Sequence, residues 1–133
     1  AMDLASAQGA KKTMSLPVSG AFHSSLMAQA QGGLKEAITG LTLRDPIIPV
    51  IANSSGRPMT TISEVREELV RGLCHCVQWR NSVKYMVGTG VSTFVEFGPA
   101  RVLTSLIKRI DKDVQAVTLF DLESIKKSSY FEN

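Results

Sequence analysis

Residues 91–120 read VSTFVEFGPARVLTSLIKRIDKDVQAVTLF, and this stretch decides the fold. It begins with a β-rich run over residues 91–97 that a Gly-Pro pair ends, which is typical of a strand buried on both faces of a parallel sheet. Apolar residues then recur at helical spacing over residues 100–110, and residues 114–120 resemble a second strand. This alternation predicts a right-handed crossover, an open parallel sheet and therefore an α/β fold.

The residues before this stretch also alternate between helical and extended patterns. Apolar spacing predicts an amphipathic helix over residues 24–41, and Thr61 with Glu64 forms a capping box at the start of another helix. The other expected elements are the end of a helix over residues 2–10, strands over residues 13–18 and 47–52, and a short helix that carries Trp79, Val83 and Met86.

Length and composition limit the classes of function. With 133 residues, 44% of them apolar, the chain can bury one core but is short for a complete α/β enzyme. The net charge of +3 comes from basic residues scattered in pairs, which argues against a nucleic-acid-binding stripe. No apolar run is long enough to cross a membrane and the start lacks an export signal, so we expect a cytoplasmic protein with Cys74 and Cys76 reduced.

His23 is the first candidate for chemistry, because it follows a predicted strand and precedes a predicted helix. Reactive groups of open parallel sheets lie on loops just past the carboxyl ends of strands. A neutral histidine there can accept a proton from a hydroxyl and return it to a leaving thiolate. On position alone, a capping or packing role for His23 is the simpler explanation.

Cys74, His75 and Cys76 stand next to one another, and these residue types can bind metals. Zinc ligands from one segment are usually separated by at least two residues, and no second pair of Cys or His residues completes a set of four. We therefore expect no metal site.

Several short motifs follow one another along the chain. They are LPVSGAFHSSLM at residues 16–27, PVIAN at 49–53, VQW at 77–79, the pairs Ser82-Val83, Tyr85-Met86 and Val102-Leu103, FVEFGP at 94–99, and LIKR at 106–109. In this order and spacing they resemble the malonyl-CoA:acyl carrier protein transacylase family, the acyltransferases that load fatty-acid and polyketide synthases. The similarity spans roughly residues 7–120.

The resemblance implies the C-terminal part of an α/β-hydrolase-like acyltransferase domain, with parallel strands and flanking helices. Residues 1–18 would be the last helix and strand of a small ferredoxin-like subdomain. Residues 19–120 would be the C-terminal part of the hydrolase-like domain, and residues 121–133 a polar tail.

The resemblance also implies a mechanism, in which a serine takes a malonyl group from coenzyme A and the phosphopantetheine thiol of acyl carrier protein removes it. His23 matches the family's general base, and Gly72 replaces a glutamine whose main-chain carbonyl orients that histidine. Asn53 matches an asparagine near the histidine, although an Asx turn before Gly56 is an equal explanation. Phe22 matches a residue that favours malonyl over methylmalonyl groups; apolar packing is its alternative role.

The family's serine is absent, because no serine here lies within a Gly-x-Ser-x-Gly turn. We therefore expect a fragment that supplies the base, is inactive alone, binds no cofactor and belongs to an enzyme with malonyl-CoA as substrate and acyl carrier protein as partner. Alternatives are a non-catalytic module that docks acyl carrier protein or a partner subunit, and a serine hydrolase relative. An unpaired sheet edge also predicts association with a missing N-terminal half or a second copy.

Overall fold

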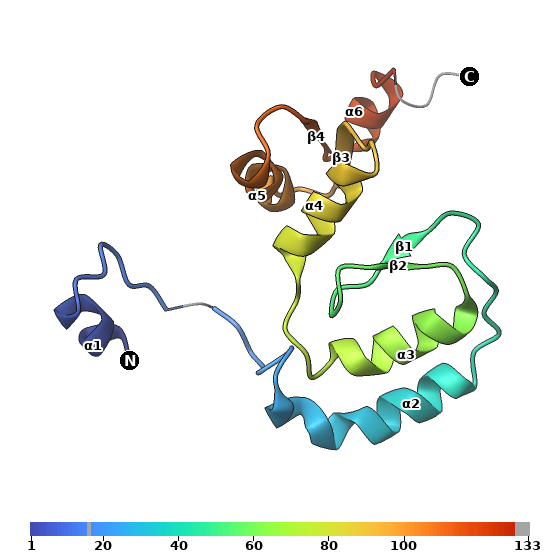
Figure 1. Ribbon diagram of the computed structural model, residues 1–133, viewed down its shortest axis with the longest axis horizontal. Coiled ribbons are helices and arrows are strands. Elements are labelled where there is room, and N and C mark those ends of the chain that lie inside the picture. The colour runs from blue at the N-terminus through green and yellow to red at the C-terminus, as the bar shows by residue number, and fades with distance from the viewer. Residues whose placement is uncertain (16, 130–133) are drawn as a thin grey trace.

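The computed structural model describes residues 1–15 and 17–129. In chain order, its elements are α1 (Met2–Ala7), the 3-10 helix η1 (Ser25–Ala30), α2 (Gln31–Thr39), β1 (Val50–Ile51), β2 (Pro58–Met59), α3 (Ile62–Gly72), α4 (Trp79–Gly88), β3 (Thr93–Phe97), α5 (Val102–Ile110), β4 (Gln115–Leu119) and α6 (Leu122–Lys126). Figure 1 shows α2 and α3 side by side, with β1 and β2 beyond α3, while α4 leads to a group formed by β3, β4 and α5. Within the described ranges, no helix combines the length and the apolar character that a bilayer crossing requires.

The strand–helix–strand unit forms as predicted, but the expected burial of its first strand on both faces is wrong, because residues 93–96 of β3 are only half-buried and Phe97 is exposed. β3 and β4 are parallel, with Val95 opposite Val117. The core of this region is a cluster of three buried side chains, Val83 of α4, Ile107 of α5 and Val114. Complete burial of a side chain of this size stabilises a fold by about 1.5–3 kcal/mol, so the cluster holds α4 and α5 against the sheet.

Glu96, near the end of β3, connects the sheet to the first turn of α5. Its carboxylate accepts hydrogen bonds from the Thr104 hydroxyl at 2.6 Å and from the backbone N–H groups of Thr104 at 2.8 Å and Leu103 at 3.1 Å. These bonds, led by the Thr104 hydroxyl, lower the pKa of Glu96 below its ordinary value. The carboxylate thereby satisfies two N–H groups that a helix start leaves without intrahelical partners.

The start of α3 carries the predicted capping box. Thr61 Oγ1 accepts from the Glu64 N–H, and the Glu64 carboxylate accepts from the backbone N–H groups of Thr60 at 2.8 Å and Thr61 at 3.0 Å. These two backbone bonds, with that of Thr60 the stronger, lower the pKa of Glu64. The sequence motif therefore specified the first turn of this helix correctly.

One predicted strand does not form. Within residues 13–18, the described residues 13–15 and 17–18 have no strand structure, and Leu16 lies outside the described residues. A strand exists only through pairing with a neighbour, and no described segment pairs with this one. The α1 helix that precedes it lies apart from the other elements (Figure 1). The domain boundaries expected at residues 18 and 120 stay predictions.

Three other elements differ in extent from their predictions. The strand expected over residues 47–52 is limited to β1, which pairs antiparallel with β2, where the sequence predicted no strand. The helix expected over residues 24–41 begins as the 3-10 helix η1 and becomes α-helical in α2. The polar tail begins with the short helix α6, capped by Asp121, and its residues 130–133 lie outside the described residues.

Candidate active site

His23 lies between α1 and η1, and the end of α3 and the turn after it hold its backbone in place. Its φ is 63°, in the left-handed region, which costs a non-glycine residue about 1–2 kcal/mol. Its N–H donates to the Leu73 carbonyl at 2.9 Å, and the Cys76 thiol donates to the His23 carbonyl with Sγ and O 3.8 Å apart. Backbone strain of this kind concentrates at functional sites and persists only where surrounding contacts support it.

A backbone carbonyl also holds the imidazole ring of His23. The Nδ1 atom lies 2.7 Å from the carbonyl oxygen of Gly72. Because a carbonyl can only accept, Nδ1 carries the proton of the neutral ring, and Nε2 carries the lone pair. No described residue forms a hydrogen bond with Nε2, so this atom is available to accept a proton.

The four residues singled out in the sequence, Phe22, His23, Asn53 and Gly72, line one cavity of about 240 Å³. Its other lining residues are Glu68, Leu69 and Leu73. The structure therefore brings together side chains from three separate segments: the loop before η1, the loop after β1, and α3. No serine is among these lining residues.

Asn53 belongs to a tight loop that is hydrogen-bonded to, and packed against, the start of α4. Its carbonyl accepts from the Gln78 N–H at 2.6 Å, and the Gly56 N–H donates to the Ala52 carbonyl at 2.9 Å. Gly56 has a φ of 68° and approaches α4 so closely that an added Cβ would lie 3.1 Å from the backbone nitrogen of Ser82. Glycine is needed here both for its backbone conformation and for the lack of a side chain.

Glu68 is a cavity residue that sequence reasoning missed. Its carboxylate accepts from the Ser54 N–H at 2.7 Å and from the Ser54 hydroxyl at 2.5 Å, and so ties α3 to the loop that carries Asn53. It precedes Gly72 by one helical turn, and its Oε1 lies 3.7 Å from where a Cβ on Gly72 would be. The four-residue spacing was the available signal, since residues i and i+4 lie on the same helix face.

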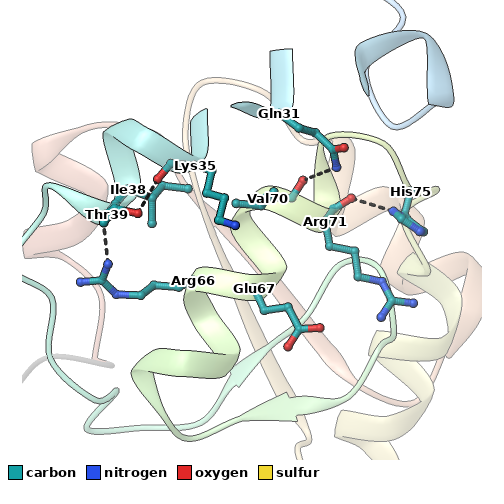
Figure 2. A pocket seen from close by; sticks show the side chains of 9 residues that line it. All are labelled: Gln31, Lys35, Ile38, Thr39, Arg66, Glu67, Val70, Arg71 and His75. Carbon is teal, nitrogen blue, oxygen red and sulfur yellow. Dashed lines mark hydrogen bonds between the residues drawn. The ribbon is translucent and has the colours of Figure 1, made fainter. Parts of the chain in front are cut away.

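A larger cavity of about 650 Å³ lies between α2 and α3 (Figure 2), and His23 is not among its lining residues. Cationic side chains line it, but several of its polar side chains already donate hydrogen bonds to backbone carbonyls near the ends of helices. Arg66 donates to the carbonyls of Ile38 at 2.9 Å and Leu41 at 2.8 Å, and Gln31 donates to the Val70 carbonyl at 3.2 Å. We place the candidate site at the smaller cavity, because it is the one that brings His23 together with Phe22 and Asn53.

The segment formed by Cys74, His75 and Cys76 does not assemble a metal site within residues 1–15 and 17–129. His75 Nδ1 lies 2.8 Å from the Arg71 carbonyl oxygen, and both cysteines are free thiols. His75 lines the larger cavity, whereas Cys76 contacts the backbone of His23. The two histidines of the chain are thus anchored alike but lie at different cavities.

Comparison with known proteins identifies relatives that match nearly the whole chain, although no protein-family model matches it. The malonyl CoA-acyl carrier protein transacylase of Bacillus subtilis is 36% identical over 126 residues, which are 95% of this chain and 40% of that protein. The crystal structure of an acyl-carrier-protein-S-malonyltransferase from Bartonella henselae is 38% identical, with a TM-score of 0.86 over 94% of this chain and 40% of that one.

A third related structure is a complex of a type II PKS acyl-carrier protein with its malonyl-transacylase, which is 34% identical with a TM-score of 0.86. The match covers 93% of this chain and 40% of the related one. These similarities confirm the predicted fold class: the chain forms part of an α/β acyltransferase domain. By sequence and by structure, nearly the whole chain matches members of the malonyl-CoA:acyl carrier protein transacylase family, and it spans about two fifths of the length of these relatives.

Proposed function

We propose that His23 is the general base of malonyl transfer from coenzyme A to acyl carrier protein. The observation that carries this proposal is the 2.7 Å contact between Nδ1 and the Gly72 carbonyl, because it leaves Nε2 as the basic nitrogen. The names of the relatives support the substrate and the partner, since they are malonyl-CoA:acyl carrier protein transacylases and one is in complex with an acyl-carrier protein. The chain would act together with a serine that it does not itself contain.

In the first half-reaction, His23 Nε2 takes the proton of the serine hydroxyl as its oxygen attacks the thioester carbonyl of malonyl-CoA. The carbon–sulfur bond then breaks, a malonyl-serine ester forms, and the imidazolium returns its proton to the departing thiolate of coenzyme A. In the second half-reaction, Nε2 takes the proton of the phosphopantetheine thiol, whose sulfur attacks the ester. The serine oxygen leaves and recovers the proton, so the histidine ends unchanged.

The Gly72 carbonyl has two roles in this scheme. It selects the Nδ1–H tautomer before the reaction, and it keeps the ring in place while Nε2 holds the proton. Since the group is main chain, the role does not depend on the side chain at position 72, and glycine can replace another residue there. Glu68 supports the same end of α3 through its bonds to Ser54.

Phe22 and Asn53 have supporting roles in the proposal. The ring of Phe22 lies against Gly20, where an added Cβ would be 2.9 Å from it, and it remains 59% exposed beside His23. A ring at this place would crowd an α-methyl group on the acyl chain and so favour malonyl over methylmalonyl. Asn53 would help to shape the cavity from the loop after β1.

The decisive experiment joins this chain, in frame, to the part of the Bacillus subtilis relative that it does not match, which includes about three fifths of that protein. Malonyl transfer from radiolabelled malonyl-CoA to acyl carrier protein is then measured. We expect His23→Ala to lower the rate by about 10²–10⁴-fold, the usual contribution of a positioned acid–base group.

His75→Ala is the matched control, because His75 is the only other histidine and is anchored in the same way by a carbonyl, that of Arg71. It should leave the transfer rate within about twofold of the parent, since a surface change away from the chemistry has little effect. An equal loss in both variants, or no loss in either, would contradict the role of His23. Retained binding of acyl carrier protein without any transfer would favour the non-catalytic docking module.

A further inference from the structure

Glu68 provides the polar link between α3 and the loop of residues 52–57. One carboxylate oxygen accepts from the Ser54 N–H at 2.7 Å, and the other accepts from the Ser54 hydroxyl at 2.5 Å. Within residues 1–15 and 17–129, no other hydrogen bond joins this loop to α3. Hydrogen bonds to an ionised carboxylate are shorter and stronger than those between neutral groups, so this one side chain holds the loop to the helix.

The side chain of Glu68 lines two neighbouring cavities. One is the cavity of about 240 Å³ that contains His23 and Asn53. The other, of about 210 Å³, lies between α3 and residues 52–59, and Ser54 lines this second cavity but not the first. The half-buried Glu68 side chain therefore lies at the wall of the candidate site, where the loop meets the helix.

The same carboxylate lies beside Gly72, whose carbonyl holds the ring of His23. Apart from the backbone of α3 and the adjoining residues, Glu68 Oε1 is the only described atom within 4 Å of an added Cβ on Gly72, at 3.7 Å. Glycine leaves this space open, and the Glu68 side chain occupies it. One side chain thus connects the loop of Asn53 with the turn of α3 that orients the imidazole.

His23 and Asn53 are otherwise anchored at different places. The last turn of α3 holds the ring of His23 through the Gly72 carbonyl. The start of α4 holds Asn53, whose carbonyl accepts from the Gln78 N–H at 2.6 Å. The placement of Asn53 relative to His23 therefore depends on the link that Glu68 makes. Positions matter at a reacting centre, because a displacement of about 1 Å can lower a rate by about 100-fold.

We infer that Glu68 is a positioning residue of malonyl transfer, which holds the Asn53 loop at a fixed place relative to His23. The inference rests on the function proposed above and concerns a residue that acts through the loop, not on the substrate. Because both carboxylate oxygens bond to Ser54, the role requires the length and the hydrogen bonds of this side chain. Glutamine keeps both, since its oxygen can accept from the N–H and its NH₂ group can donate to the hydroxyl oxygen, whereas aspartate is one CH₂ group shorter.

The test uses the same joined enzyme and measures kcat and KM for malonyl-CoA, with the folded fraction of each variant determined by circular dichroism. We expect Glu68→Ala and Glu68→Asp to lower kcat by about tenfold or more with KM changed less than about threefold, and Glu68→Gln to keep kcat within about threefold of the parent. A side chain that only stabilised the fold would lower the melting temperature and leave kcat per folded enzyme unchanged. The matched control is Glu67→Ala, because Glu67 is the preceding residue of α3 but is exposed and does not line the cavity of His23.

Ser54→Ala tests whether Glu68 acts through the loop. This change removes the hydroxyl and keeps the backbone N–H, so we expect a smaller loss in kcat, about threefold. In the Glu68→Ala background it should add no further loss, because its partner is already absent. Ser55→Ala is the control in the same loop, since the Ser55 hydroxyl accepts from the Arg57 N–H at 3.3 Å and not from α3.

The outcomes separate this inference from the proposed function. If His23→Ala lowers the rate while Glu68→Ala leaves kcat unchanged, the inference is overturned and the proposed function stands. Losses that multiply in the double variant would also overturn it, and so would a Glu68→Gln variant as impaired as Glu68→Ala, because the charge and not the position would then matter. An unchanged rate in His23→Ala would instead contradict the proposed function, and the inference would fail with it.

Discussion

Gly56→Ala tests how the loop beside the candidate site is held. An alanine there must adopt a φ of 68°, which costs about 1–2 kcal/mol, and its Cβ would lie 3.1 Å from both Asn81 Cβ and Ser82 N. Overpacking of this kind costs a further 1–3 kcal/mol or so, because the atoms it meets belong to the start of α4 and cannot move aside freely. We expect a total loss of about 2–5 kcal/mol in the free energy of unfolding.

Gly90→Ala is the matched control, since Gly90 has a φ of 97° but no atom within 4 Å of an added Cβ. It should show only the conformational cost, about 1–2 kcal/mol. Urea unfolding followed by the fluorescence of Trp79, the single tryptophan, measures both, and Gly56→Ala should have the lower midpoint by about 0.5–2 M. Equal midpoints would refute the close packing of the 52–57 loop on α4.

Two further predictions concern stability elsewhere. The pKa of Glu96 is lowered chiefly by the Thr104 hydroxyl, so its carboxylate stabilises the fold above its ordinary pKa of 4.5, and this contribution is lost as pH falls through the lowered value. The difference in unfolding free energy between the parent and Glu96→Gln should therefore be full near neutral pH and shrink below 4.5; a difference that grows on acidification would contradict this. Gly33→Ala, within α2 and with no atom near its added Cβ, should raise the urea midpoint and helical circular dichroism by removing a cost of about 1 kcal/mol. A lower midpoint would show that this position needs glycine.

Much of the fold could be predicted where neighbouring residues decide it. The capping box of Thr61 and Glu64 specified the start of α3, because its partners are three residues apart. The two β-rich runs on either side of a helical pattern, with the Gly-Pro pair after Phe97, predicted the strand–helix–strand unit in which β3 and β4 pair in parallel. The strand over residues 13–18 could not be judged in this way, because local propensity says nothing about whether a partner strand is present.

By itself, the sequence determined the order and type of most elements, and its collinear motifs identified His23, Gly72, Asn53 and Phe22 as residues to examine. Only the tertiary structure decided that they share one cavity, since His23 and Gly72 are 49 residues apart and meet through the packing of whole segments. It also decided which ring nitrogen of His23 is available, because the tautomer depends on a carbonyl that no local pattern can place. Glu68 emerged only from the structure for the same physical reason: its contact with Ser54 joins a helix to a loop, and its geometry depends on the path of the chain between them.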